Sequence, residues 1–184
     1  MKFIVEHREP ELFPWCLIEY KHISKIAGKE NVIFTNIKKG KRELQKWGTV
    51  YKKSILQLKF PNAYVLDPSA QKTLSPQDRF DTLILGGILG DHPPRARTKK
   101  ELSLKLPYPT RNLGKKQFST DTAVYVARKI MQGKKLNDLQ FRDGIEIHLN
   151  TTESVELPFT YVLRKGKPLL PPGLIKHLRE RKEF

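Results

Sequence analysis

The residues best suited to chemistry lie in one stretch, residues 81–98, which reads DTLILGGILGDHPPRART. It starts with a short apolar run, residues 82–85, which predicts a strand buried in a parallel sheet. A glycine-rich segment follows, where the backbone can bend sharply and approach a ligand closely. Its candidate site residues are Gly86, Gly87, Gly90, Asp91, Arg95 and Arg97. Because open α/β sheets bind ligands at the carboxyl ends of their strands, the stretch predicts a ligand site, with a simple turn as the alternative.

Two later segments also combine glycine, polar and apolar residues in the manner of a binding site. Residues 111–121 read RNLGKKQFSTD, and residues 153–162 read ESVELPFTYV. Together with the first loop they offer backbone amides, backbone carbonyls and small apolar walls. This combination suits a nucleoside-like ligand that is held mainly by the main chain.

Several common kinds of catalytic site are not supported by the sequence. No G-x-G-x-x-G opens a helix after the first predicted strand, and there is no G-x-x-x-x-G-K-[ST], so neither a dinucleotide fold nor P-loop hydrolysis is expected. The five histidines are scattered and the single cysteine is Cys16, which excludes a multi-cysteine zinc site. No serine or cysteine lies in a nucleophile elbow. We therefore expect no metal centre.

Short apolar runs and helical patterns predict the α/β scaffold that positions these loops. The predicted strands are residues 2–6, 31–36, 63–66, 82–85 and 145–149. The predicted helices run from Pro14 to a stop at Gly28, over 38–46, over 53–58, from a start at 75–77, over 122–132 and over 172–182. The β-α-β opening favours a parallel sheet. Residues 157–159 are expected to form an apolar turn.

In the first predicted helix, four apolar residues are assigned to the core. They are Trp15, Ile18, Ile23 and Ile26. His22 is expected at the surface or partly buried, rather than as a ligand. Any of the polar residues 119–121 can cap the helix that follows them.

The composition is that of a globular protein. Hydrophobic residues make up 38% and charged residues 29% of the 184 residues, and no apolar run is long enough to span a membrane. Acidic residues follow the first apolar run directly, so the start does not read as a signal peptide. One cysteine fits a reducing compartment. We expect a single domain that lies in the cytoplasm and does not associate with membranes.

The charge balance is strongly basic. Thirty-five Lys and Arg against nineteen Asp and Glu give a formal net charge of +16. A field of this sign attracts polyanions, which predicts a nucleic acid or ribonucleoprotein as partner. A solvated basic surface without a specific partner is the alternative reading.

The three loops resemble those of the SPOUT class of S-adenosylmethionine (SAM)-dependent methyltransferases. More closely, ILGGILGDHPPRART, RNLGKKQFSTDTAV and ESVELPFTYV look like one SPOUT family, long labelled a SAM-dependent RNA methyltransferase family, in an archaeal-type form. The resemblance implies an α/β fold with a parallel sheet and a C-terminal trefoil knot. It divides one SPOUT domain, 1–184, into a Rossmann-like half, 1–80, and a knotted SAM-binding half, 81–184, that ends in a basic helix.

The resemblance also implies the cofactor, SAM, with S-adenosylhomocysteine as its product, and the residues that bind it. The first loop would contribute Leu85, Gly86, Gly87 and Gly90. The second would contribute Leu113, Gly114, Phe118 and Ser119, and the third Leu157, Pro158 and Phe159.

The chemistry follows from the cofactor, whose sulfonium methyl group is already a strong electrophile. The enzyme needs to align a nucleophile and to take a proton if the nucleophile carries one. Asp91 and Asp121 are the candidate bases, with Glu153 and Glu156 next, although Asp121 also suits a helix cap. Arg97 could hold an RNA phosphate or stabilise negative charge; an exposed basic loop is its alternative role.

Two methyl acceptors remain open. The eukaryotic branch of the family is linked to methylating an arginine in a small-subunit ribosomal protein, and an arginine would need carboxylates to pair with its guanidinium. The alternative is tRNA or rRNA, which the net charge of +16 favours. A non-enzymatic RNA-binding module is disfavoured because all three loops are present. The sequence leaves the choice between monomer and homodimer open, as it does a gating role for the basic C-terminal tail.

Overall fold

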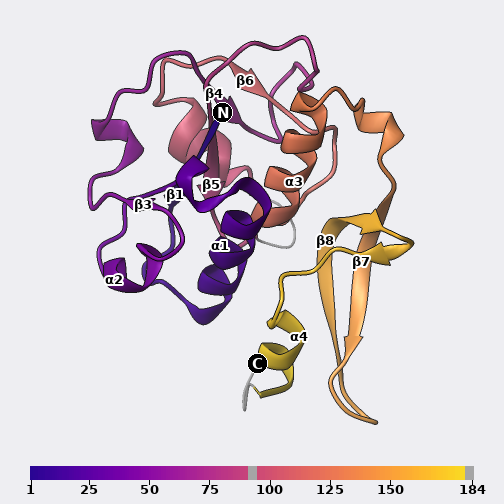
Figure 1. Cartoon of the computed structure of the whole chain (residues 1–184). Coiled ribbons are helices and arrows are strands. Elements are labelled where there is room, and N and C mark those ends of the chain that lie inside the picture. Colours follow the sequence, from indigo (N-terminus) through magenta and orange to yellow (C-terminus); the bar gives the residue numbers. More distant parts are fainter. Residues whose placement is uncertain (91–94, 181–184) are drawn as a thin grey trace.

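A six-stranded parallel sheet forms the centre of the computed structural model, which describes residues 1–90 and 95–180 (Figure 1). The strand order is β3-β2-β1-β5-β4-β6, and every neighbouring pair is parallel. The strands are β1 (Lys2–His7), β2 (Val32–Thr35), β3 (Thr49–Val50), β4 (Ala63–Leu66), β5 (Thr82–Gly87) and β6 (Thr110–Arg111). Because all strands run the same way, their carboxyl ends share one edge of the sheet.

Both faces of this sheet are covered, which explains why its central strands read as continuous apolar runs. Alternate side chains such as Val5 and Leu85 pack on one face against α1 (Pro14–Ala27) and α3 (Thr120–Met131). Their neighbours Ile4 and Ile84 pack on the other face with residues of the short helical turns η2 (Ile55–Gln57) and η3 (Lys99–Ser103).

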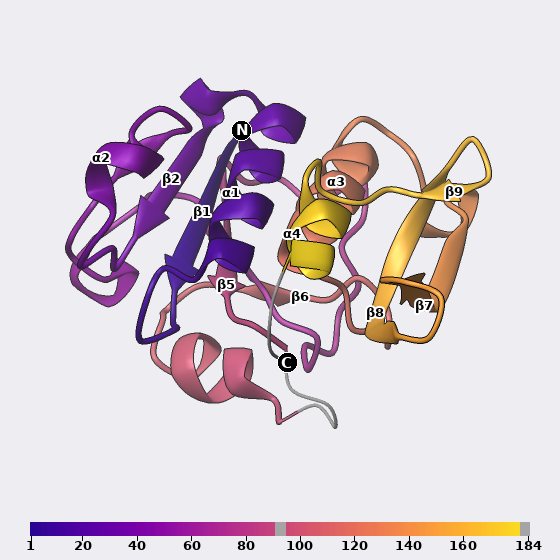
Figure 2. The ribbon, with the colours of Figure 1, turned by 90° about the horizontal axis from the view of Figure 1, so that it is seen from below.

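A second, antiparallel sheet extends away from the parallel one (Figure 1). It consists of β7 (Phe141–His148), β8 (Ser154–Arg164) and β9 (Lys167–Pro168). The last helix, α4 (Leu174–Glu180), lies between this sheet and α1 (Figure 2). Its Leu174 and Leu178 join an apolar cluster with Tyr161 of β8, and Trp15 and Ile18 of α1 pack against that cluster.

The structure confirms the parallel β-α-β opening and the predicted strands, although the strand predicted at 145–149 begins four residues earlier, at Phe141. Ile23 and Ile26 are buried, and Trp15 and Ile18 are partly buried at the contact with α4, as expected of core residues. The helix expected at 122–132 begins two residues earlier, with Ser119 as its N-cap. The last helix starts at Leu174, not Pro172, because Gly173 has a φ of +91°.

Four local predictions were wrong. Only α2 (Lys41–Leu44) is helical within 38–46, and only the 3₁₀ turn η2, closed by a capping box between Ser54 and Gln57, within 53–58. Residues 75–77 form a turn in which Asp78 accepts from the Ser75 amide, and no helix follows. Residues 157–159 are not a turn but the middle of β8. Short segments of this kind are decided by tertiary packing more than by local propensity.

Within residues 1–90 and 95–180, no helix is long and apolar enough to cross a membrane. The same residues contain no group of three His, Cys, Asp or Glu side chains that could hold a metal ion.

Candidate active site

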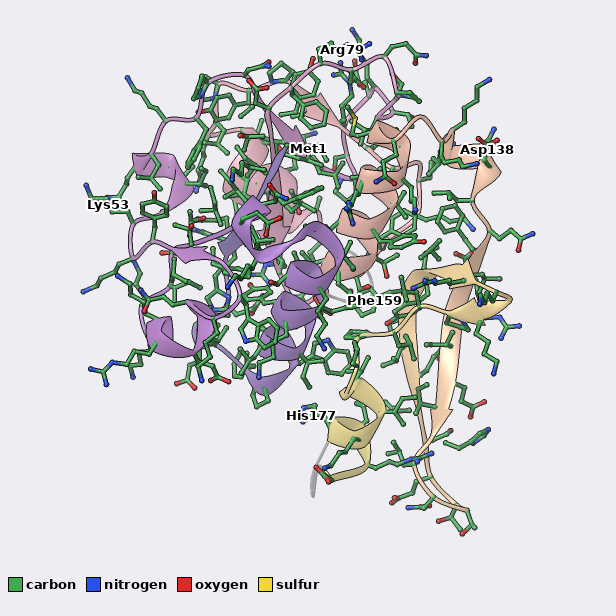
Figure 3. The ribbon with its side chains drawn as sticks, in the orientation of Figure 1. Met1, Lys53, Arg79, Asp138, Phe159 and His177 are labelled. Atoms are coloured by element: carbon green, nitrogen blue, oxygen red, sulfur yellow. The ribbon has the colours of Figure 1, made fainter. Side chains whose placement is uncertain are left out.

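A cavity of about 650 Å³ opens at the carboxyl ends of β4 and β5. One wall comes from the start of α1 and another from the loop that leads into α3. Phe159 of β8 and His177 of α4 also line the cavity. Figure 3 labels both residues, Phe159 beside β8 and His177 at α4. A cavity of this size can enclose most of a drug-sized ligand.

The three loops that the sequence singled out converge at Gly90. A Cβ at that position would lie 2.4 Å from Cε1 of Phe159 and 2.5 Å from Nε2 of Gln117, closer than carbon contacts allow. The amide of Thr160 also donates to the carbonyl of Gln117 over 2.8 Å, which fastens the second loop to β8. Gly90 is therefore required for close approach of the loops.

In the first loop, Leu85 and Gly86 line the cavity but Gly87 does not. A Cβ on Gly87 would lie 2.1 Å from the hydroxyl of Tyr20 and 2.9 Å from Cγ1 of Val5. Gly87 thus makes room for the core on the face of the sheet covered by α1, and its place in the structure is that of a packing residue.

In the second loop, Leu113, Phe118 and Ser119 line the cavity, together with Lys115 and Lys116. Gly114 is outside the lining and adopts a φ of +85°, with its amide bonded to the Asn112 side chain over 2.8 Å. Its position therefore reflects a turn that only glycine adopts easily.

In the third segment, Phe159 reaches the cavity and its two predecessors do not. Pro158 and Phe159 together oppose the single residue Gly144 of β7, because the register between the strands shifts there. Proline, which lacks an amide donor, is tolerated at such a bulge. Leu157, 2% exposed, packs into the cluster with α4 instead.

Arg97 lines the cavity, but its charge is already neutralised by carboxylates. It donates to Glu9 and to Glu101, both over 2.8 Å, and Arg8 donates to the other oxygen of Glu101 over 2.7 Å. Glu9 in turn accepts from the amide of Leu89. Partial burial alone would lower the pKa of Arg97, but the ion pairs outweigh it and raise that pKa. For Glu101, burial alone would raise the pKa, and the ion pairs with Arg8 and Arg97 outweigh it and lower that pKa. The network ties the glycine loop to the segment after β1, so Arg97 has the contacts of a positioning residue.

Asp121 is fully buried and faces α1. Its Oδ2 lies 2.6 Å from Nδ1 of His22, and the Ser119 hydroxyl donates to its Oδ1 over 2.7 Å. His22 was expected at the surface or partly buried, but it is only 7% exposed, because the packing of α1 on α3 encloses its ring. Asp121 therefore holds Ser119 at the cavity wall and does not line the cavity itself.

The other candidate acids do not gather in the cavity. Glu156 is exposed on β8 opposite Glu146, and Glu153 is exposed near the hairpin turn, where it accepts from the Asn150 side chain. Asp91 lies outside the described residues, so the structure does not locate it.

Two buried carboxylates do line the cavity, Asp67 and Glu19, and the sequence reasoning missed both. Asp67 accepts from the amide of Ser69 over 2.8 Å. The second acid, Glu19, lies on α1. It is 7% exposed, and the indole Nε1 of Trp15 donates to its Oε1 over 2.9 Å. Burial, and next the charge of Asp121, raise the pKa of Glu19 to about 8, while hydrogen bonds from Trp15 and Thr120 oppose the shift. The available signal was an acid on the apolar, core-facing side of a helix that starts beside a predicted ligand loop.

The site thus combines apolar walls and close backbone approach with two buried carboxylates, Asp67 and Glu19. The apolar walls and the close approach of the backbone suit a nucleoside, such as the adenosine of SAM. The carboxylates suit a cationic group, since a buried acid gains most from an opposite charge at short range.

Comparison with known proteins agrees with this chemistry. The model of a family described as "Protein arginine N-methyltransferase SFM1-like" matches residues 2–183. The chain is 37% identical to the protein arginine N-methyltransferase SFM1 of Saccharomyces cerevisiae, over 98% of this chain and 95% of that protein.

Solved structures extend the comparison. The chain resembles yeast SFM1 complexed with SAH at a TM-score of 0.86 and 35% identity, covering 96% of this chain and 94% of that one. The complex with SAM matches with the same TM-score, 34% identity, and coverage of 97% and 89%. The dual specific Trm10 from Thermococcus kodakaraensis, at TM-score 0.57, 20% identity and coverage of 74% and 95%, shares the fold alone and agrees with the expected α/β class.

Proposed function

Since the chain belongs to the SFM1-like family of protein arginine N-methyltransferases, it is a SAM-dependent methyltransferase, and we propose that its acceptor is an arginine of a small-subunit ribosomal protein. The observation that carries the arginine acceptor is the buried carboxylate of Glu19 at the cavity wall. A guanidinium presents a planar fork of donors that a carboxylate accepts in pairs. An RNA acceptor would offer this acid no guanidinium to pair with.

The residues around the cavity fit SAM. Gly86 and Gly90 let the backbone approach the ligand, while Leu85, Leu113 and Phe118 supply apolar surface for an adenine ring. Phe159 closes the side towards β8. When bound there, SAM supplies an electrophilic methyl group.

The protein's own part in the reaction is to orient the acceptor nitrogen and to accept the proton that it loses. Glu19 would pair with the guanidinium and align one nitrogen with the methyl group, as the proximity contribution to catalysis requires. As the nitrogen becomes alkylated its proton must leave, and the carboxylate of Glu19 is placed to receive it. The indole of Trp15 holds that carboxylate in one orientation, and Asp121 acts indirectly by fixing Ser119.

The same proposal includes the finer points that the family resemblance implies: a single catalytic domain over 1–184, a trefoil knot in the C-terminal half, and a cytoplasmic location. The knot is supported by the path of residues 112–119, which leave the sheet edge at β6 and run between the glycine loop and β8. A crystal structure of the protein with SAH tests the knot, and cell fractionation tests the location.

The acceptor is tested by transfer of labelled methyl from SAM to small ribosomal subunits from a source that lacks this methylation. The expected result is label in one ribosomal protein, mapped to an arginine by mass spectrometry, and its loss with Glu19→Gln. Asp138→Asn, which alters a carboxylate in the turn after α3 and outside the cavity, is the matched control and keeps the label. Label in rRNA, or equal labelling by Glu19→Gln, would overturn the proposal.

A further inference from the structure

A dense group of exposed basic side chains lies at the same sheet edge as the cavity. It follows the carboxyl ends of β2 and β3 and includes the short helix α2. We name it the basic edge and define it as Lys38, Lys39, Lys41, Arg42, Tyr51, Lys52 and Lys53, all exposed. Lys53 projects outward from the body of the protein in Figure 3.

The backbone holds the two halves of the basic edge side by side. The amides of Asn36 and Ile37 donate to the carbonyls of Lys53 and Tyr51, over 2.9 and 3.1 Å. Lys38 reaches the carbonyl of Lys52 from its side chain over 3.5 Å. The positive charges are therefore concentrated by fixed main-chain geometry.

The basic edge is connected to the cavity through hydrogen bonds and packing contacts of the fold. The Asn36 side chain donates to the carbonyl of His7 over 2.7 Å, and the next amide, that of Arg8, donates to Gly87 over 3.1 Å. Gly40 lies against Leu12, the neighbour of the cavity residue Phe13. Within the sheet, three strand spacings, about 14 Å in all, separate β3 from β5.

Few acidic residues lie near the basic edge in the sequence. Residues 37–60 contain eight Lys and Arg and one acid, Glu43, although the whole chain holds nineteen Asp and Glu. Glu43 pairs with Lys21 of α1 over 3.2 Å. Among the residues that the structure describes, none of the basic side chains of the basic edge forms an ion pair with a carboxylate.

The basic edge also contains an aromatic side chain, that of Tyr51. Tyr51 is 40% exposed and is followed in sequence by Lys52 and Lys53. Basic grooves with exposed aromatic rings are how proteins bind single-stranded nucleic acid, since phosphates pair with the cations and a base stacks on the ring. The carboxylates of an acidic protein surface would pair with these basic side chains, but such a surface would gain little from the Tyr51 ring.

We propose that the basic edge binds the phosphate backbone of single-stranded RNA, with one base stacked on Tyr51. The contact is sequence-independent and salt-dependent. RNA binding itself does not depend on the proposed acceptor. If the acceptor arginine belongs to a ribosomal protein, RNA held at the same end of the strands as the cavity would retain the particle while the arginine enters the cavity.

The test measures fluorescence anisotropy of a short unstructured RNA between about 50 and about 200 mM KCl. The triple variant Lys38→Glu, Lys52→Glu, Lys53→Glu should bind at least about tenfold more weakly, with the slope of log affinity against log salt reduced by about 2. Tyr51→Ala should weaken binding severalfold at every salt concentration, and Tyr51→Phe should restore it, because stacking needs the ring and not the hydroxyl.

The matched control has the same charge change at another exposed site: Lys134→Glu, Arg164→Glu, Lys167→Glu. It should bind RNA within about threefold of the unmodified protein. Equal losses in the two triple variants would overturn the proposal, as would displacement of RNA by polyglutamate at equal charge. SAM affinity, measured by calorimetry, should be unchanged in both. If RNA binds as described but no arginine is methylated, the proposed function fails and this inference stands.

Discussion

The indole Nε1 of Trp15 donates a hydrogen bond of 2.9 Å to Oε1 of Glu19, one helical turn further along α1, and both side chains line the cavity. The spacing of four residues places the two side chains on one face of the helix. The bond holds one oxygen of the carboxylate, and hydrogen bonds from Thr120 also reach this acid. The proton on this acid then decides whether the cavity accepts a cation.

Methyl transfer to arginine should therefore depend on the protonation of Glu19. Its pKa is raised, so the carboxyl is protonated and uncharged below about pH 8 and ionised above it. Because only the ionised form attracts a guanidinium, kcat/KM for an arginine peptide should rise with pH through this range. Steady-state kinetics at pH values on both sides of this pKa measure the rise, and Glu19→Gln should remove it. A pH profile in Glu19→Gln that matches the unmodified protein would contradict this role.

Two of the three glycines of the first loop should differ in function, Gly90 in ligand binding and Gly87 in core packing. Gly90→Ala places a methyl group against Phe159 and Gln117 at the cavity, so it should weaken SAM binding about tenfold or more. Gly87→Ala places one against Tyr20 in the core, so it should lower the free energy of unfolding by about 1–3 kcal/mol. Calorimetry and urea denaturation measure the two effects. The reverse assignment would show that Gly87, not Gly90, contacts the cofactor.

The sequence predicted the strand at 82–85 and the glycine loop because both are local signals: an apolar run of the length of a buried strand, then glycines. It could not predict the partner of His22, which lies 99 residues away in Asp121. Similarly, the Leu-Pro-Phe segment has the composition of a turn, and only its pairing with Gly144 makes it a bulged strand. Glu19 went unnoticed because its role depends on which loops meet above α1.

The buried pair of His22 and Asp121 should stabilise the contact between α1 and α3. His22→Ala leaves the carboxylate without its partner at 2.6 Å, inside a site that excludes water. We expect a loss of about 2–4 kcal/mol in the free energy of unfolding, as for other buried pairs that lose one member. Urea denaturation measures it. His148→Ala, an exposed histidine on β7, is the control and should change stability by less than about 0.5 kcal/mol.

Arg97 should act on SAM binding through Glu9 and Glu101 rather than by direct catalysis. Removal of its guanidinium breaks two ion pairs of 2.8 Å and frees Glu9, which also holds the amide of Leu89. Arg97→Gln should therefore weaken SAM binding by about 1–2 kcal/mol, the scale of charged hydrogen bonds that are partly exposed.

A double-mutant cycle distinguishes this positioning role from direct catalysis. With Glu101→Gln as the second change, the two losses in SAM affinity should be less than additive, because they remove the same contact. The rate of a single turnover at saturating SAM should fall no more than about threefold in Arg97→Gln, since a residue that only orders the loop does not touch the reacting atoms. Fully additive losses, with a rate reduced about a hundredfold at saturation, would instead assign Arg97 to the chemical step.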